Sequence, residues 1–161
     1  MAGRLTVGVG DLALSDRKGN ELVTYSLGSC MAVIIHDPMA GVGGMLHFML
    51  PESRLNPERA RKQPGLFADT GLPLLFQGAY ARGAKKGRLR VVVAGGSQVI
   101  DGTGHFNVGA RNYAAMRKIF WRNNVLIDAE DVGGRASRTV GLEIGTGRVW
   151  IRLNCAEAKD L

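Results

Sequence analysis

Three side chains within the first fifty residues are of the types that hydrolyse amides and esters: Cys30, His47 and Thr24. A cysteine thiolate is a strong nucleophile, and a neighbouring imidazole makes it available at neutral pH by taking the thiol proton and later returning it to a leaving group. Gly28 and Ser29 allow a sharp turn that exposes backbone N–H groups to a developing oxyanion. Thr24, six residues before Cys30, is placed to orient the imidazole through its hydroxyl or carbonyl. These five residues predict a candidate site for thiol-dependent hydrolysis.

A predicted β-hairpin brings the cysteine and the histidine together. Two short apolar runs, residues 31–36 and 41–47, flank the four-residue connection Asp37–Ala40, whose proline favours a type I turn. Counting outward from this loop places Cys30 directly opposite His47 on one face of the hairpin. Directly opposed residues have Cβ atoms roughly 4.5 to 5.5 Å apart, so a thiol and an imidazole would meet there.

Two alternatives compete with this interpretation. A helix beginning at Met31 would place Cys30 at its N-terminus, where the helix dipole favours a thiolate. We prefer the strand because the run is short, β-branched and ended by Asp37 and Pro38. A cysteine in an apolar strand is also more often inert packing than a nucleophile, so the spacing alone leaves both roles open.

The composition is that of one globular domain. The 161 residues are 45% hydrophobic and 22% charged, and 23 glycines with 5 prolines are too few for a low-complexity chain. We therefore expect a single domain over residues 1–161. Two cysteines, Cys30 and Cys155, cannot form the disulfide framework of a small secreted scaffold, which predicts a reduced, intracellular protein. The chain shows no signal-peptide pattern and no membrane-length apolar run, so we expect a cytoplasmic protein that is not inserted in a membrane.

The chain carries a formal net charge of +7, with basic residues gathered in Arg54–Lys62 and Arg82–Arg90. Such an excess favours an acidic partner, while a solvated basic face explains it equally well. No aromatic residues are interleaved with the basic ones as nucleic-acid binding would require, so no nucleic-acid partner is expected. The stretch from Asn56 to Gln63 has no hydrophobic periodicity and predicts no regular element.

Short apolar runs bounded by turn residues predict strands along most of the chain. They cover Leu5–Val9, Glu21–Ser26, Met31–His36, Met45–Leu50, Val91–Val93, Val125–Asp131, Thr139–Ile144 and Arg148–Leu153. Apolar residues at helical spacing predict two helices, one capped by Asp69 or Thr70 and ending near Gly83, the other from Asn107 to about Asn123. Two helices among seven or eight strands predict an α/β domain.

Beyond these patterns, the sequence closely resembles the chemoreceptor glutamine deamidase family, CheD. The resemblance runs in order through Thr24–Cys30, Asp37–Pro38, Gly43–Pro51, Gly95–Gly96, Val108–Asn112, Glu130–Gly134 and Gly145–Trp150. It therefore covers nearly the whole chain. One departure is Ala94–Ser97, where members of the family usually carry Phe-Gly-Gly-Ala. We expect this difference to affect local packing or a partner surface rather than the active site.

The resemblance implies both a fold and an activity. It implies a layered α/β/β sandwich shared with cysteine-dependent deamidase toxins, with Cys30, His47 and Thr24 as catalytic residues. The implied reaction hydrolyses glutamine side chains on the cytoplasmic helices of chemoreceptors to glutamate, through a thioester and without a cofactor. Glutamyl methyl esters are a second implied substrate, and a CheC-type phosphatase is an implied regulatory partner.

Three other functions are alternatives to thiol-dependent hydrolysis. A metal site would need His36, His105 or Cys155 beside Cys30 and His47, but no metal-binding spacing is present, so no metal is expected. Phosphate binding by Gly102–Gly104 lacks the Walker and dinucleotide patterns. A catalytically idle adaptor that binds a phosphatase or a receptor is the non-enzymatic alternative, and the intact trio argues against it. We expect His36, His105 and Cys155 to have no catalytic role.

Overall fold

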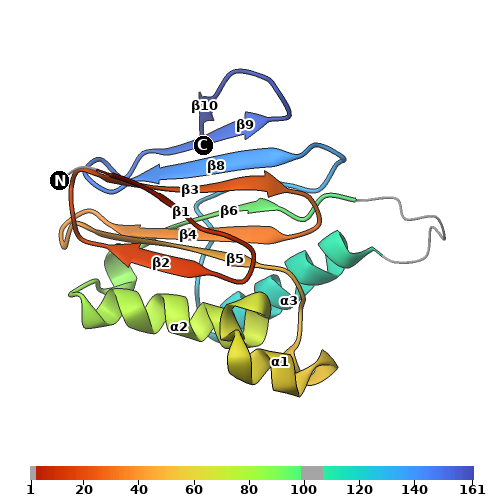
Figure 1. Ribbon diagram of the computed structural model, residues 1–161. Helices are drawn as coiled ribbons and strands as arrows, with labels where there is room; N and C mark the ends of the chain where they lie inside the picture. Colours follow the sequence, from red (N-terminus) through yellow and green to blue (C-terminus); the bar gives the residue numbers. More distant parts are fainter. Residues whose placement is uncertain (1–2, 99–106) are drawn as a thin grey trace.

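Two five-stranded β-sheets and a layer of helices make up the structure, a computed structural model that describes residues 3–98 and 107–161 (Figure 1). The first sheet has the strand order β1-β3-β8-β9-β10, and the second has the order β2-β5-β4-β6-β7. The strands are β1 (Gly3–Thr6), β2 (Leu12–Ser15), β3 (Asn20–Leu27), β4 (Met31–Asp37), β5 (Val42–Phe48), β6 (Arg90–Gly95), β7 (Ala129–Val132), β8 (Arg138–Glu143), β9 (Val149–Leu153) and β10 (Lys159–Asp160).

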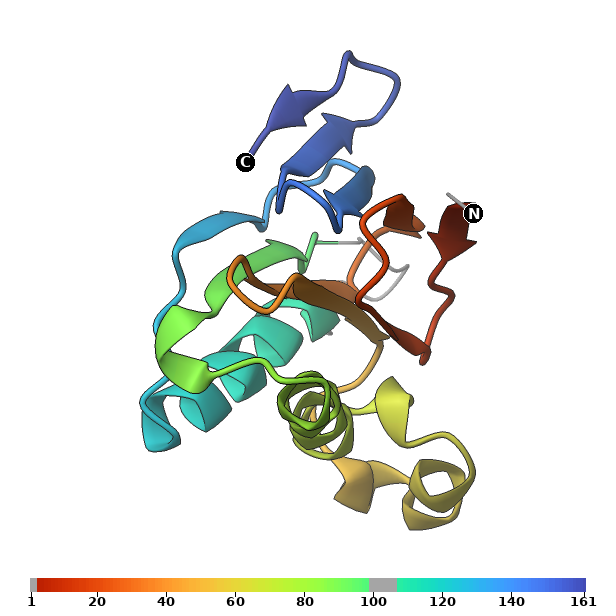
Figure 2. The same ribbon diagram turned by 90° about the vertical axis from the view of Figure 1, so that its left-hand side faces the viewer.

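Helices cover only the second sheet, on the face turned away from the first. They are α1 (Pro57–Lys62), α2 (Ala68–Ala81) and α3 (Val108–Arg122), with short 3-10 turns η1 (Ser53–Leu55), η2 (Pro64–Leu66) and η3 (Lys86–Arg88). Seen edge-on, the helices, the second sheet and the first sheet form successive layers (Figure 2). This arrangement confirms the expected α/β/β sandwich with two main helices. Within the described residues, none of these helices is both long and apolar enough to span a lipid bilayer.

Strand β4 separates two hydrophobic cores because its side chains alternate between faces. Val33 and Ile35 pack with the helices, whereas Ala32 and Ile34 pack against the first sheet. All seven residues of this strand are buried. The even-numbered face of β4 therefore points into the space between the two sheets, where polar side chains need partners from the opposite sheet.

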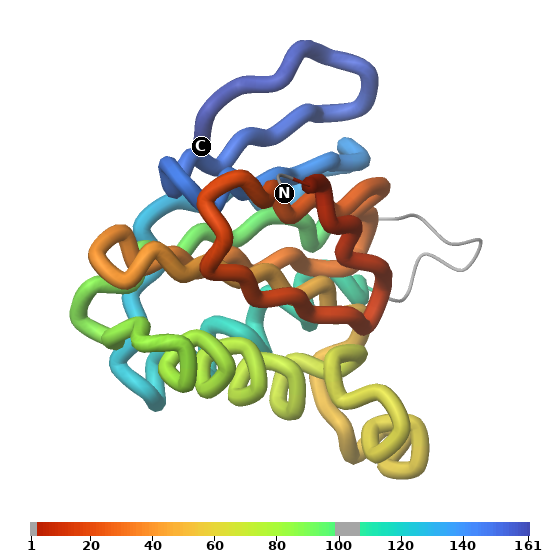
Figure 3. The backbone as a smooth tube through the Cα atoms, turned by 60° about the vertical axis from the view of Figure 1, so that its left-hand side comes forward, coloured from red at the N-terminus to blue at the C-terminus, as the bar shows by residue number. Residues whose placement is uncertain are grey.

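The N-terminal segment joins the two sheets. Strand β1 pairs in parallel with β3 in the first sheet, and β2 pairs antiparallel with β5 in the second. Between them the chain crosses from one sheet to the other at the edge of the sandwich, as the red part of the tube shows (Figure 3). Neither β2 nor the short helix α1 is predicted from the sequence, because each is too short for its periodicity to be visible.

The helix starts differ from the predictions in one case. Asn107 caps α3 as expected, its side chain accepting a hydrogen bond from the Ala110 N–H. Helix α2 begins at Ala68 without a side-chain cap, because the predicted caps are used elsewhere. The Asp69 carboxylate accepts from the Ser53 backbone and hydroxyl, and the Thr70 hydroxyl donates to the Pro64 carbonyl.

The predicted hairpin of β4 and β5 forms, but the predicted register of its strands is wrong by two residues. Asp37 pairs with Val42, and His47 lies opposite Ala32 rather than opposite Cys30. The loop starts one residue later than expected because Asp37 remains in the strand, while Gly41 closes the turn with a φ of +68°. A shift of two residues keeps every side chain on its predicted face.

Asp37 fixes this end of the sheet. Its side chain is fully buried and accepts hydrogen bonds from the N–H groups of Met39, Ala40 and Lys85 and from the Arg88 guanidinium. Burial raises the pKa of Asp37, but these donors outweigh it and lower the pKa to about 2.

We expect Asp37→Asn to lower the free energy of unfolding at pH 7 by about 2 to 3 kcal/mol. Because the folded-state pKa of Asp37 is depressed, its contribution is present above the unfolded pKa near 4 and is lost as the pH falls towards 2. Urea unfolding of the wild type and Asp37→Asn at pH 7 and pH 3 measures this. Equal stability of the two proteins at pH 7 would contradict it.

Candidate active site

A buried hydrogen bond between the two sheets forms the centre of the candidate site. Thr24 lies on β3 of the first sheet, and His47 lies on β5 of the second. The Thr24 hydroxyl oxygen is 2.7 Å from His47 Nδ1, and the two residues are 0% and 2% exposed. The structure therefore brings together Thr24 and His47, as the sequence predicts, by facing the two sheets rather than by pairing strands.

The partners of Thr24 determine which nitrogen of His47 carries the proton. The Thr24 hydroxyl donates its only hydrogen to the Val7 carbonyl, 2.6 Å away, because a carbonyl can only accept. Its oxygen must then accept from His47, so the hydrogen lies on Nδ1. His47 Nε2 is left as an unprotonated acceptor. This nitrogen is buried and has no hydrogen-bond partner among the described residues.

Burial lowers the pKa of His47, and the nearby Asp11 carboxylate partly opposes this by raising it. A lowered imidazole pKa means that the neutral form dominates at neutral pH. His47 is thus held as a neutral imidazole with a free lone pair, the form in which it can accept a proton.

Cys30 lies in the turn between β3 and β4. Backbone hydrogen bonds and a close contact from Gly95, Gly96 and Ser97 hold this turn in place. The Gly96 N–H donates to the Cys30 carbonyl at 2.9 Å, and the Ser97 N–H donates to the Gly28 carbonyl at 2.8 Å. Gly95, at a φ of +107°, approaches so closely that a Cβ there would lie 2.3 Å from the Cys30 carbonyl oxygen. The Gly95–Gly96 pair is therefore needed for contact with the turn that carries Cys30.

Cys30 packs on the side of β4 that faces the first sheet. It precedes Ala32, the residue opposite His47, by two positions, and it is partly buried against the core cluster to which Ala32 belongs. Diagonal neighbours of this kind are typically about 7 Å apart, and Nε2 makes no hydrogen bond to Cys30 in this structure. Bonds between catalytic groups are often long in the absence of substrate and shorten when it binds.

The protonation state of Cys30 follows from its partial burial. Burial raises the pKa of the Cys30 thiol, and its own backbone N–H lowers it to a smaller extent. The resting pair is therefore a neutral thiol beside a neutral imidazole. The N–H groups of Ser29 and Cys30 donate to no backbone carbonyl of the described residues, which leaves them available to an oxyanion.

Several residues of the site are missed by the sequence analysis. His47 is held through its backbone by the Gly10 N–H and the Asp11 carbonyl, both in the crossing between β1 and β2. The buried Arg138 donates to the Ser97 hydroxyl and to the Gly95 carbonyl, and so supports the segment behind Cys30. These contacts join segments far apart in the chain, and no local pattern indicates them.

The remaining candidates lie away from the trio or outside the described residues. His36 is buried at the other end of β4, where its Nε2 donates to the Ile144 carbonyl. Cys155 is free and exposed, and Cys30 is also free. His105 and Gly102–Gly104 fall outside the described residues. Across residues 3–98 and 107–161, no three His, Cys, Asp or Glu side chains gather as metal ligands would.

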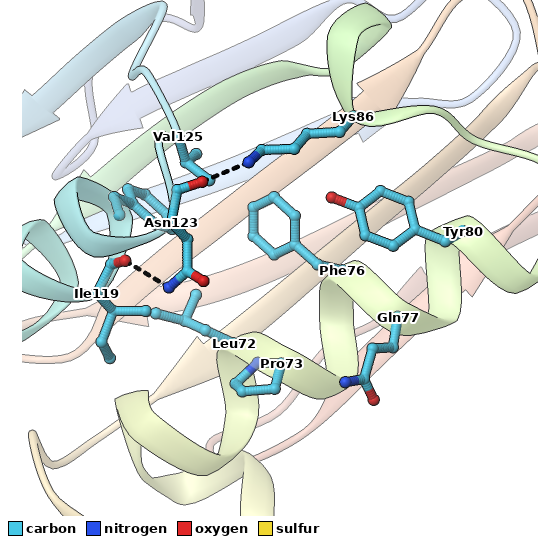
Figure 4. A pocket seen from close by; sticks show the side chains of 10 residues that line it. Leu72, Pro73, Phe76, Gln77, Tyr80, Lys86, Ile119, Asn123 and Val125 are labelled. Atoms are coloured by element: carbon cyan, nitrogen blue, oxygen red, sulfur yellow. Dashed lines mark hydrogen bonds between the residues drawn. The ribbon is translucent and has the colours of Figure 1, made fainter.

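One pocket lies away from the trio. It has a volume of about 310 Å³ and lies between α2 and α3, with Phe76, Tyr80 and Ile119 among its lining residues (Figure 4). At its rim the Lys86 ammonium donates to the Asn123 carbonyl. Its lining contains neither a cysteine nor a histidine, so we do not assign the hydrolytic chemistry to it.

The two basic clusters lie at opposite ends of the sandwich. Arg54–Lys62 follows the end of β5 that adjoins Cys30, whereas Lys85 and Arg88 contact Asp37 at the far end of β4 (Figure 1). The seven residues of β4 separate these ends by roughly 20 Å. Of the two clusters, the first follows the end of the sheet that adjoins Cys30.

Comparison with protein families gives one match over most of the chain. Residues 49–153 match the family model of CheD, described as chemotactic sensory transduction. That range begins after Cys30 and His47, so the trio is covered by the matches to individual proteins.

Those matches extend over almost the full length. The chain is 48% identical over 159 residues to a protein of Syntrophus aciditrophicus named "Probable chemoreceptor glutamine deamidase CheD 1", covering 99% of each chain. It is 52% identical over 148 residues to the corresponding CheD 2 of Anaeromyxobacter dehalogenans, covering 92% of this chain and 93% of that one. It is 38% identical over 146 residues to the chemoreceptor glutamine deamidase CheD of Thermotoga maritima, covering 91% and 89%.

Proposed function

This chain belongs to the CheD family, and we propose that it is a protein-glutamine deamidase that acts on chemoreceptors. The names of its relatives support the substrate class. The observation that carries the chemistry is the bond from His47 Nδ1 to Thr24, which leaves Nε2 unprotonated on the face that Cys30 shares. We also propose that the protein is a single domain, is located in the cytoplasm and needs neither a metal nor a cofactor.

The proposed reaction has two acyl-transfer steps. Cys30 Sγ attacks the carboxamide carbon of a glutamine side chain while His47 Nε2 takes the thiol proton. His47 then gives this proton to the nitrogen, ammonia leaves, and a thioester remains on Cys30. Water attacks the thioester with Nε2 as base, releasing glutamate and restoring the thiol. A glutamyl methyl ester would react by the same steps with methanol as the leaving group.

Each step passes through a tetrahedral oxyanion that needs hydrogen-bond donors. The N–H groups of Ser29 and Cys30 are suited to this role. The carbonyls of Gly28, Ser29 and Cys30 accept hydrogen bonds from the segments packed against the turn, and in a trans peptide the N–H points away from the carbonyl. One well-placed donor of this kind lowers the barrier by about 3 kcal/mol. The Thr24 hydroxyl keeps the imidazole in the tautomer that the reaction requires.

We expect co-expression with cytoplasmic receptor fragments to convert specific glutamines to glutamates, and Cys30→Ala to reduce the rate by at least about 1000-fold. Mass spectrometry of the receptor peptides measures the conversion. Cys155→Ala is the matched control, because it removes the other thiol, which is exposed and far from the turn in sequence. It should retain wild-type activity.

Two outcomes would contradict the proposal in different ways. Conversion that persists in Cys30→Ala would exclude the thioester mechanism. Unchanged glutamines with the wild-type protein, across several native receptors, would favour an adaptor that binds a receptor or a CheC-type phosphatase without chemistry.

We further propose that the basic residues of α1 steer acidic receptor helices to the site. Arg59 and Arg61 are exposed at the end of the molecule that carries Cys30, and neither forms an ion pair among the described residues. Steering by such groups raises association rates and weakens as salt screens it.

Charge reversal at both ends of the molecule tests this. We expect Arg59→Glu combined with Arg61→Glu to lower kcat/KM on a receptor fragment by about tenfold at low salt and less at high salt. Arg82→Glu combined with Lys85→Glu changes the net charge equally at the far end and should have little effect. Equal losses in the two variants, or rates insensitive to salt, would exclude steering by α1.

A further inference from the structure

One buried polar side chain near the trio has no role in the mechanism above. Asn112 lies in the second turn of α3 and is fully buried. Its carboxamide nitrogen donates to the Ser29 carbonyl at 3.0 Å and to the Met49 carbonyl at 2.9 Å. Both partners are carbonyl oxygens, so the nitrogen must face them and the orientation of the amide is fixed.

These two carbonyls belong to the segments that carry the thiol and the imidazole. The Ser29 carbonyl is part of the peptide bond that leads into Cys30, and Met49 is two residues after His47. The β4–β5 ladder ends at the pair Met31 and Phe48. Cys30 and Met49 would form the next pair, and at this position the Asn112 amide bridges the two strands instead.

The oxygen of the same amide indicates that favourable packing alone does not account for Asn112. Asn112 Oδ1 is buried, and no group within residues 3–98 and 107–161 forms a hydrogen bond with it. A buried acceptor without a partner costs free energy, and such groups are rare in folded proteins. The two bonds from the nitrogen are therefore the interactions that account for an asparagine at this place in an otherwise apolar helix face.

We propose that Asn112 is a positioning residue that sets the separation of Cys30 and His47. This inference rests on the proposed function, because it assumes that the two side chains act as a pair. Asn112 touches neither reacting atom. It holds the turn of Cys30 against the end of β5 beyond the last ladder pair, so that the thiol can reach Nε2 when a substrate binds. Errors of about 1 Å in such a separation can reduce a rate by about 100-fold.

The alkylation of Cys30 by iodoacetamide reports this pairing without a protein substrate. Cys155→Ala serves as the background for every protein, so that Cys30 is the only reactive thiol. If His47 assists as a base, the rate has a plateau near neutral pH in addition to the rise that follows thiolate formation. The plateau should be absent from His47→Asn, which retains the thiol but lacks the base.

We expect Asn112→Ala to lose this plateau and to follow the profile of His47→Asn, with kcat on a receptor fragment lowered by about 100-fold and KM changed little. Asn112→Ser, which keeps one donor, should give an intermediate profile and also serves if the alanine variant does not fold. Asp37→Asn is the matched control, since it weakens the fold at the far end of β4 and should keep the plateau.

The outcomes separate this inference from the proposed function. If the background protein and His47→Asn already have the same profile, no thiol–imidazole pair exists and both proposals fail. If they differ and Asn112→Ala keeps the plateau, the pair is real and Asn112 does not position it. Loss of the plateau in Asp37→Asn as well would reduce the effect to general destabilisation and would also overturn the inference.

Discussion

The hydrogen bond between Thr24 and His47 is the interaction on which the candidate site depends, because it joins the two sheets and fixes the imidazole at once. The Thr24 hydroxyl has only one hydrogen, and in this buried space it donates that hydrogen to the Val7 carbonyl. The proton of His47 must then lie on Nδ1, which leaves Nε2 as a base. A buried acceptor without a hydrogen-bond partner costs folding free energy, and a role in a reaction is one reason for a protein to retain such a group.

The surrounding architecture also positions Cys30, the proposed nucleophile, relative to that nitrogen. Three segments converge on the turn of Cys30: the end of β6 at Gly95–Gly96, the N-terminal part of α3 through Asn112, and β3 itself. Because burial disfavours charge on both Cys30 and His47, the resting pair is neutral. The sandwich thus holds these side chains at one end of its interior.

Local patterns predicted the parts of this arrangement that depend on local physics. The alternation along β4, the Asn107 cap and the faces of Cys30 and His47 follow from periodicity and turn residues. Residue types and spacing indicated the trio, and the resemblance to CheD implied its catalytic roles. The register of the hairpin did not follow, because donors from Lys85 and Arg88, which are distant in sequence, hold Asp37 in the strand. The supports of the site, such as Gly10 and Asn112, depend on contacts distant in sequence and could not be predicted either.

The tautomer of His47 tests the central interaction most directly. In ¹⁵N-labelled protein at pH 7, the two ring nitrogens of a neutral imidazole have distinct chemical shifts that identify the protonated one. A hydrogen on Nδ1 and an unprotonated Nε2, with this preference lost in Thr24→Val, is the expected result. A hydrogen on Nε2 in the wild type, or an imidazolium at that pH, would mean that Thr24 does not prepare His47 as the base for Cys30.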